Sequence, residues 1–600
     1  MKRKQVDSIY KWNLNNIYKT KKKFKKDLDI VIKKNKELLK YKNKLGDFKV
    51  FKDFFLENEK INKLEEKMQF FLCILQVEQN NQFALDLESL YSQKMMELDG
   101  KFTWISEEVS KFNQKDFLNF IQNDIELKYY YKYYQDFFKE LKYMLPYKQR
   151  KILSRVTNSS SIIYEMYETL LFKDNKHRKV EINNKIYELN SSTYSDLLLN
   201  SRPIEDQMVR VKFSLEFKKE LKEKKHTLIK LYDNIVRSNI EHLKLIKKEN
   251  FYDYFFDKED FYKLHLEVLL NAAKESSNLN NKYLKLYKDF FKFDNKFYST
   301  DTSLKFYQAD KNKISVDNAK EIIKKHLSCL GQEYMNFLDI AFENHKIDYY
   351  EDENKATGAF TIPSYDFDNL ISMNWTDDFE SVYTLIHELG HSVHSLFANK
   401  YQPKPLNTFG NLIAEIASTF NEHLLSDKLL KNSDHKQKIN ILQNNIDFIA
   451  SNFFSSARWT KFEIETFKLV ENNQIINYNS IKNIIDNTFK KSDLLDEYDE
   501  ECKYYDWTQI SHLYEEPFYL YKYAVSIAFS YHLYNDFVIN NDYNKFISFL
   551  KEGGSLEPLE LFKKYGFDCT KSDSYLPLIK HFENLITQLE NLLKKINTNN

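Results

Sequence analysis

Apolar residues recur with the period of an α-helix along much of the first 170 positions. One amphipathic stretch, which we expect to end by Gly46, places these residues on a single helix face: Leu28, Val31, Ile32, Leu38 and Leu39. A denser apolar run over 70–75 predicts a more buried helix. The pattern therefore predicts a helical region over about residues 17–170.

A different pattern follows between Lys179 and Leu189. Apolar and polar residues alternate on both sides of Asn183-Asn184, which predicts a small β-hairpin. Helical periodicity resumes after Arg202-Pro203. We therefore expect a boundary near residue 200, with an N-terminal helical domain over 1–200 and a second domain over 201–600.

Two more short strands are predicted over Lys355–Ile362 and Leu370–Trp375. Gly358 and Ala359 lie in the first of them, and their small size suits the close approach of another backbone. The alternative is an ordinary structural hairpin. Either way, this is a small β element in a chain whose other patterns are helical.

Glycine and proline are scarce, at 9 and 8 residues, and no glycine occurs between Gly100 and Gly331. A β-rich fold would need more turn-forming residues, so this composition favours long helices joined by polar loops. A hydrophobic content of 42% is sufficient for a large core. The expected fold class is therefore mainly α.

The charge balance argues against a nucleic-acid partner, because 89 basic and 88 acidic residues give a net charge of +1. We interpret the lysine-rich run over 19–26 as a solvated helix face. No segment has the length of an uncharged membrane span, and no apolar region follows the charged N-terminus. The four cysteines are far apart in the sequence, so we expect reduced thiols. These features predict a cytoplasmic protein without a membrane partner, and they leave its oligomeric state open.

Candidate chemistry lies in the segment His387-Glu388-Leu389-Gly390-His391. Residues four apart share a helix face, so the two imidazoles could bind one zinc ion. Glu388 could then accept a proton from a zinc-bound water, as in metallopeptidases. The alternative is a helix with two hydrogen-bonded histidines. His394 lies roughly 7 Å further along the axis than the expected metal, so we interpret it as a residue behind the ligands or on the helix surface.

A catalytic zinc site needs a third protein ligand and an open position for water. The proline- and glycine-containing break over 402–410 predicts that a second helix begins near Asn411. Glu415 and Glu422 lie on the same face of that helix. Position alone does not decide which of them would reach the metal.

The segments His387–Ser395 and Ala414–Thr419 resemble those of the M3 family of zinc oligopeptidases, and oligoendopeptidase F in particular. Further similar segments are Trp12–Tyr18, Gly358–Phe360, Ser372–Trp375 and Trp507–Ala524. The resemblance implies that Glu415 is the third ligand, with His387 and His391, of one zinc ion per chain. It also implies a mainly α, two-lobed body that encloses a deep substrate channel, with a zincin-type helix beside a small β element.

The tyrosine-rich segment Trp507–Ala524 is the expected source of groups that stabilise the transition state. Amide hydrolysis places negative charge on the carbonyl oxygen, and a positioned donor can share it with zinc. From the resemblance we expect Tyr521 to be that donor, and Tyr514 and His512 to contact the substrate carbonyl or the tetrahedral intermediate. With 42 tyrosines in the chain, aromatic core packing is the alternative.

These expectations combine into a zinc endopeptidase that cleaves internal bonds of short, unstructured peptides, with Glu388 as general base. Gly358 and Ala359 would bind the substrate backbone beside an edge strand. Three alternatives stay open at this point. They are a zinc carboxypeptidase or dipeptidase of similar fold, a catalytically silent peptide-binding protein, and a helical scaffold.

Overall fold

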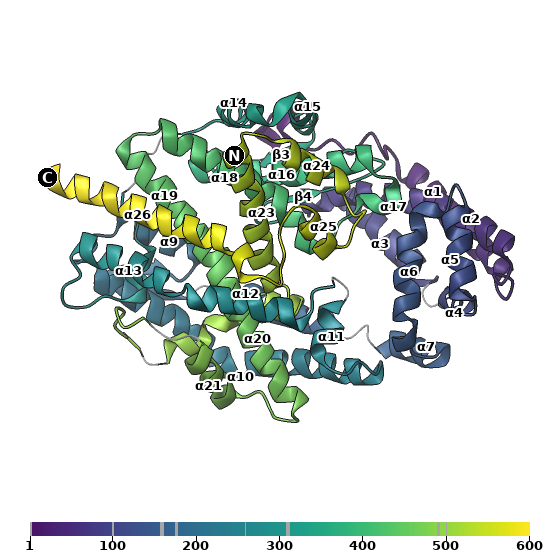
Figure 1. Cartoon of the computed structure of the whole chain (residues 1–600), viewed down its shortest axis with the longest axis horizontal. Helices are drawn as coiled ribbons and strands as arrows, with labels where there is room; N and C mark the ends of the chain where they lie inside the picture. Colours follow the sequence, from purple (N-terminus) through teal and green to yellow (C-terminus); the bar gives the residue numbers. More distant parts are fainter. Residues whose placement is uncertain are drawn as a thin grey trace. The chain divides into compact units, whose positions relative to one another are not determined.

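The computed structural model of the chain describes residues 3–98, 101–156, 161–174, 178–257, 260–307, 313–488, 492–499 and 501–599. Most of these residues are helical, and the strands are few and short (Figure 1). This confirms the predicted mainly α fold class.

Contacts group the chain into two compact units. The first unit comprises Met1–Thr157, Asn312–Phe409 and Phe546–Leu556, and the second comprises Asn158–Lys311, Gly410–Lys545 and Glu557–Asn600. The sequence domains predicted to meet near residue 200 stay a prediction, as does the substrate channel.

The first unit begins with helices that confirm the periodicity of the N-terminal region. Their bounds are α1 (Lys21–Leu38), α2 (Phe48–Leu72), α3 (Gln82–Met96), α4 (Trp104–Val109), α5 (Gln114–Asn123), α6 (Tyr131–Glu140) and α7 (Tyr147–Val156). Helix α1 ends at Leu38, well before Gly46, because the chain tightens into a 3₁₀ turn over Leu39–Tyr41.

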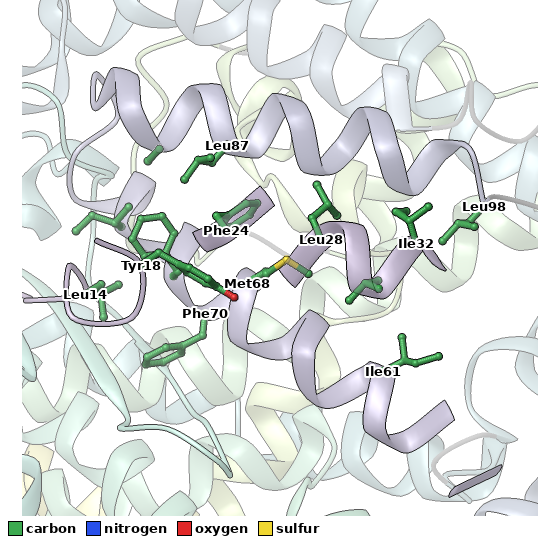
Figure 2. Close-up of a cluster of buried hydrophobic side chains, with 14 of the residues drawn as sticks. Leu14, Tyr18, Phe24, Leu28, Ile32, Ile61, Met68, Phe70, Leu87 and Leu98 are labelled. Atoms are coloured by element: carbon green, nitrogen blue, oxygen red, sulfur yellow. The ribbon is translucent and has the colours of Figure 1, made fainter. Parts of the chain in front are cut away.

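Apolar side chains of α1, α2 and α3 meet in one buried cluster (Figure 2). Phe24 and Leu28 of α1 point toward Met68 of α2 and Leu87 of α3. All four are at most 1% exposed. Burying a side chain of this kind stabilises the fold by about 1.5–3 kcal/mol, so this seam holds the three helices together.

The rest of the first unit contains a three-stranded sheet and several helices. Its elements are α14 (Val316–Leu327), α15 (Gly331–Ala341), β3 (Ile347–Tyr350), β4 (Phe360–Ile362), β5 (Leu370–Trp375), α16 (Phe379–Tyr401), α17 (Lys404–Asn407) and most of α24 (Asn544–Glu552). The strand order is β3-β5-β4, with β5 parallel to β3 and antiparallel to β4. Strand β4 therefore lies at the edge, and α16 packs against both β4 and β5.

The strand predicted over Lys355–Ile362 is correct only for its last three residues. Gly358 has a φ of +76°, which is incompatible with a strand, and Lys355 is buried in the preceding loop. The Lys355 Nζ donates to the Asp348 carboxylate over 2.8 Å, and Arg3 Nη1 donates to the same carboxylate over 2.7 Å. This buried ion pair fixes the loop before β4 in a non-extended form.

Among its described residues, the second unit consists of helices and one hairpin. Its elements are α8 (Ser161–Glu168), β1 (Lys179–Ile182), β2 (Lys185–Glu188), α9 (Ser191–Asn200), α10 (Gln207–Leu245), α11 (Phe251–Phe255), α12 (Lys263–Glu275), α13 (Asn278–Phe291), α18 (Asn411–Asn432), α19 (His435–Ile449), α20 (Ser456–Glu471), α21 (Tyr478–Thr488), α22 (His512–Glu515), α23 (Leu520–Asn540), α25 (Pro558–Lys564) and α26 (Leu576–Asn599). The predicted hairpin is confirmed, with Asn183 and Asn184 at φ +52° and +61° in its turn.

Helices α18 and α23 lie side by side in this unit (Figure 1). The Ser526 hydroxyl donates to the Leu412 carbonyl over 2.8 Å, and the Ser530 hydroxyl donates to the Ile416 carbonyl over 3.0 Å. Both serines are fully buried. Because the paired residues advance by four along each helix, the contact holds the two helices parallel and in register.

No helix among the described residues combines the length and the apolar character needed to cross a bilayer. Cys73, Cys329 and Cys569 are thiols rather than members of disulfides, as the sequence predicted for them. The side chain of Cys502 lies outside the described part of the structure.

Helix α20 carries a carboxyl group in the core of the second unit. Glu463 is 1% exposed, and its Oε1 accepts the backbone N–H of Phe518 over 2.7 Å. Burial raises the pKa of Glu463 to about 8, although the Phe518 hydrogen bond opposes the shift. The titratable group facing it from α10 is Tyr232, whose pKa is itself raised by burial and by this carboxyl.

This burial predicts a pH dependence of stability. Between the ordinary pKa of 4.5 and the folded value of about 8, the folded protein holds a proton that the unfolded chain has released. The contribution of this group to the free energy of unfolding is fully present below pH 4.5, and it is lost as the pH rises through about 8. Glu463→Gln should therefore gain in melting temperature relative to wild type between about pH 5 and about pH 8.5. If the difference in melting temperature between Glu463→Gln and wild type were the same at every pH, the raised pKa of Glu463 would be contradicted.

Candidate metal centre

Helix α16 presents the two histidines of the motif. Asp378 caps its N-terminus by accepting the N–H of Ser381 over 2.8 Å. Leu385, Ile386 and Leu389 are fully buried, so one side of the helix is anchored in the core of the first unit. The predicted helix is therefore present, and Gly390 does not interrupt it.

The imidazoles of His387 and His391 converge on one side of α16. Their Nε2 atoms are 3.1 Å apart and their ring centroids are 4.8 Å apart. Two nitrogens bound to one tetrahedral zinc ion at about 2.0–2.1 Å would be separated by about 3.3 Å. The pair therefore fits the spacing that zinc requires.

One group of three potential metal ligands occurs among the residues that the structure describes: His387, His391 and Glu415. Each offers one ligand atom, and these atoms all lie within 4.8 Å of one another. Two imidazoles and a carboxylate form a donor set that zinc uses in catalytic sites. Glu422, which sequence position left as an equal candidate, is not in the group.

Glu388 is nearly buried, with 5% of its surface exposed. Its Oε2 accepts a hydrogen bond from the Thr361 hydroxyl over 2.7 Å, and the same hydroxyl lies 2.9 Å from the Glu388 carbonyl. Thr361 is the middle residue of edge strand β4. Thr361 was not predicted from the sequence, although a hydroxyl within a predicted strand before the motif was an available signal.

His394 lies in the core of the first unit, so the surface position offered for it was wrong, and the other interpretation, a residue behind the ligands, stays a prediction. The ring is 1% exposed and stacks on Phe409 with centroids 4.0 Å apart. Neither ring nitrogen has a hydrogen-bond partner among the described residues. Burial lowers the pKa of His394 to about 3, which keeps the imidazole neutral.

Tyr514 and Tyr521 are both buried in aromatic surroundings of the second unit. The Tyr514 ring stacks on Tyr167 with centroids 4.0 Å apart, and its hydroxyl has no hydrogen-bond partner in the described part of the chain. The Tyr521 ring packs on Phe256 and Phe261, with centroids 5.1 and 4.8 Å away. Both rings thus have aromatic neighbours, and the roles expected for Tyr514 and Tyr521 in catalysis stay predictions.

A different pair of tyrosines accompanies His512. The His512 ring stacks on Tyr519 with centroids 5.2 Å apart, and its Nε2 lies 3.3 Å from the Tyr523 hydroxyl. Burial, and then the negative charge of Glu415, raise the pKa of Tyr523 to about 12. The same two causes are among those that raise the pKa of Tyr519. Both tyrosines therefore keep their protons and can donate hydrogen bonds near Glu415.

The helical period explains why Tyr519 and Tyr523 both lie beside His512. Residues four apart share a face, whereas a residue two positions away points to the other side. This signal was available in the sequence, because Tyr519 and Tyr523 are four residues apart in the tyrosine-rich segment.

Gly358 and Ala359 directly precede β4 instead of lying in it. Asn374 fixes their backbone by donating from Nδ2 to the Gly358 carbonyl over 2.7 Å. Gly358 is exposed and Ala359 is half-buried. Their predicted contact with a substrate backbone stays a prediction.

Comparison with known proteins places this chain in a family. The model of peptidase family M3 matches residues 202–581, and a model described as oligopeptidase F matches residues 108–176. The chain belongs to peptidase family M3. Peptidases of family M3 are zinc metallopeptidases, so the possible His/His/Glu site agrees with the family. The resemblance seen in the sequence motifs is confirmed.

Relatives within family M3 cover the whole length of the chain. An oligoendopeptidase F homologue of Borreliella burgdorferi is 26% identical, over 99% of this chain and 100% of its own length. Oligopeptidase PepF of Bacillus subtilis is 24% identical, over 99% of this chain and 89% of its own. The crystal structure of oligoendopeptidase-F from Enterococcus faecium shares the fold, with a TM-score of 0.72, 18% identity, and coverage of 96% of this chain and 99% of the other. This M3 protein is thus a metallopeptidase of the oligopeptidase kind.

Metal analysis of this M3 peptidase tests the assignment of the third ligand. We expect wild type to bind one zinc ion per chain, and Glu415→Ala to bind it at least about tenfold more weakly because a ligand is lost. Glu422→Ala, on the same helix, should bind zinc as wild type does. Inductively coupled plasma mass spectrometry after gel filtration gives the stoichiometry, and titration against a chelator gives the affinity. Normal zinc affinity in Glu415→Ala would exclude this ligand.

Proposed function

We propose that this M3 peptidase is a zinc-dependent endopeptidase that hydrolyses internal bonds of short, unstructured peptides. The observation that carries the proposal is the group His387, His391 and Glu415, whose ligand atoms lie within 4.8 Å of one another. Its neighbour in the motif, Glu388, supplies a carboxylate in a nearly buried position. Internal cleavage of short peptides is proposed from the names of the oligoendopeptidase relatives. The cytoplasmic location stays a prediction.

Zinc bound by His387, His391 and Glu415 would activate water and polarise the scissile carbonyl. The Glu388 carboxylate accepts the proton of the attacking water and then delivers it to the leaving amine. The Thr361 hydroxyl, at 2.7 Å from Oε2, holds this carboxylate in one orientation throughout. A fixed base avoids reorganisation during the proton transfers.

Hydrogen-bond donors for the developing oxyanion come from the cluster around His512. We assign this role to the hydroxyls of Tyr519 and Tyr523, because both tyrosines feel the charge of Glu415. Neutral tyrosines can donate to the carbonyl oxygen as its negative charge grows. His512 lies 3.3 Å from the Tyr523 hydroxyl and orients it.

The substrate backbone is proposed to pair with edge strand β4. A peptide can extend a sheet by adding a strand to an open edge, and main-chain hydrogen bonds then bind it without regard to its side chains. Thr361 uses its side chain toward Glu388, so a peptide on this edge would lie next to the base. Gly358 and Ala359 leave room for it where the strand begins.

The first kinetic test replaces the proposed base. Glu388→Gln should lower kcat by about 10²–10⁴-fold on an internally quenched peptide blocked at both ends, because the proton acceptor is lost. Zinc content should stay unchanged. Glu380→Gln, an exposed position in the first turn of the same helix, should retain wild-type activity.

Other outcomes of this assay have distinct meanings. An enzyme that cleaves the unblocked peptide but leaves the blocked one intact is an exopeptidase. Zinc binding without any hydrolysis by wild type would identify a silent peptide-binding protein.

The second test compares two tyrosines of α23. Tyr523→Phe should lower kcat by about 10²-fold with little change in KM, because its hydroxyl acts mainly in the transition state. Tyr521→Phe, measured in parallel, decides between the two candidate donors, and under the assignment to Tyr523 its loss should be the smaller one. Steady-state kinetics on the blocked peptide gives both values. A larger loss in Tyr521→Phe would restore Tyr521 as the donor.

A further inference from the structure

Glu463 is a buried carboxyl group that the proposed mechanism does not use. It lies on α20 with 1% exposure, and its Oε1 accepts the Phe518 N–H over 2.7 Å. Its Oε2 has no hydrogen-bond partner among the described residues. Burying a carboxyl costs free energy. Its hydrogen bond to the backbone of another segment therefore calls for a physical role.

The residue held by Glu463 has a strained backbone. Phe518 has a φ of +61°, in the left-handed region that costs a non-glycine residue about 1–2 kcal/mol. Pro517 precedes it. Such a conformation persists only where its surroundings fix it.

Two sets of contacts fix Phe518. Its ring, 2% exposed, packs among four phenylalanines: Phe251, Phe255, Phe256 and Phe467. Its N–H is directed by the hydrogen bond to Glu463. The ring contacts hold the side chain in place, whereas the carboxyl oxygen determines the orientation of the peptide group.

This peptide group lies in the connection between α22 and α23. Helix α22 begins with His512, and Tyr519 directly precedes α23. The stacking of His512 on Tyr519 and the 3.3 Å approach of His512 to Tyr523 both depend on how this connection turns. A rotation at Phe518 would change the angle between the two helices and separate the three side chains.

We propose that Glu463 is a positioning residue for the His512, Tyr519 and Tyr523 cluster, acting through the strained Phe518 turn. The inference rests on the proposed function, because it takes this cluster as the source of the oxyanion donors. Glu463 does not touch the substrate in this account. Its effect is on the geometry of groups that act in the transition state.

Three variants at this position separate the role of the acceptor oxygen from that of charge and volume. Glu463→Gln keeps a carbonyl oxygen for the Phe518 N–H. Glu463→Leu keeps a similar volume but leaves that N–H buried without a partner. Glu463→Asp has a side chain one methylene group shorter, so its carboxyl oxygen lies further from the Phe518 N–H. It replaces the leucine variant in the test if that variant does not fold.

The matched control is Thr460→Val on the same helix. Thr460 is fully buried, and its hydroxyl donates to the Ser456 carbonyl over 2.8 Å, so its hydrogen bond stays within α20. Thr460→Val thus removes a buried hydrogen bond from α20 without touching the connection at Phe518.

The experiment measures kcat and KM of the zinc-loaded full chain on the blocked peptide, well below the lowest melting temperature. Glu463→Leu and Glu463→Asp should lower kcat by about tenfold or more with KM within about twofold, because small displacements of oriented groups act on the transition state. Glu463→Gln and Thr460→Val should stay within about threefold of wild type. A phosphinic peptide imitates the tetrahedral intermediate. Relative to wild type, it should bind Glu463→Leu more weakly by the same factor by which kcat/KM falls.

The possible failures can be told apart. If wild type is active, and Glu463→Leu and Glu463→Asp are as active as Glu463→Gln, the inference about Glu463 is overturned while the proposed function stands. Equal losses in Glu463→Leu and Thr460→Val would also overturn it, since general loosening of α20 would then explain both. A zinc-loaded wild type that cleaves no peptide would overturn the proposed function and this inference together.

Discussion

The close parallel packing of α18 and α23 is the constraint on which the second unit depends. Two buried serines of α23 donate hydrogen bonds to the Leu412 and Ile416 carbonyls of α18, so the helices cannot slide past one another without breaking both bonds. Glu415 belongs to α18, Tyr523 lies in the first turn of α23, and Tyr519 directly precedes that helix. The packing therefore holds the third potential ligand and the proposed donors at a fixed distance, as a preorganised site requires.

Buried polar contacts fix the segments that regular structure alone would leave adjustable. The Asp348 carboxylate ties down the loop before β4 through Lys355, and Thr361 on β4 then reaches Glu388. In the second unit, Glu463 fixes the turn before α23. Each contact is costly if broken, because an unpaired buried group has no water to replace its partner. Because hydrogen bonds and ion pairs are directional, such contacts select one conformation of a segment, whereas apolar packing alone is compatible with several.

Local patterns predicted a large part of the fold. The N-terminal helices, the hairpin around Asn183 and the strand over Leu370–Trp375 all follow from apolar periodicity and turn residues. The strand over Lys355–Ile362 failed for most of its length because a buried ion pair and the φ of Gly358 override its propensity. A residue 7 positions away along the chain, Asp348, supplies the partner in that ion pair, and no local pattern reveals it.

The sequence by itself determined the two histidines and the glutamate between them, because the helical period alone brings residues four apart to one face. It also limited the third ligand to two glutamates of one helix. The family resemblance pointed to Glu415, but only the tertiary structure brought its carboxylate within 4.8 Å of the histidine ligand atoms. Only the tertiary structure, too, joined Thr361 to Glu388 and placed Tyr519 and Tyr523 beside His512. The physical reason is that these contacts join separate elements, so they depend on packing between elements that no single segment encodes.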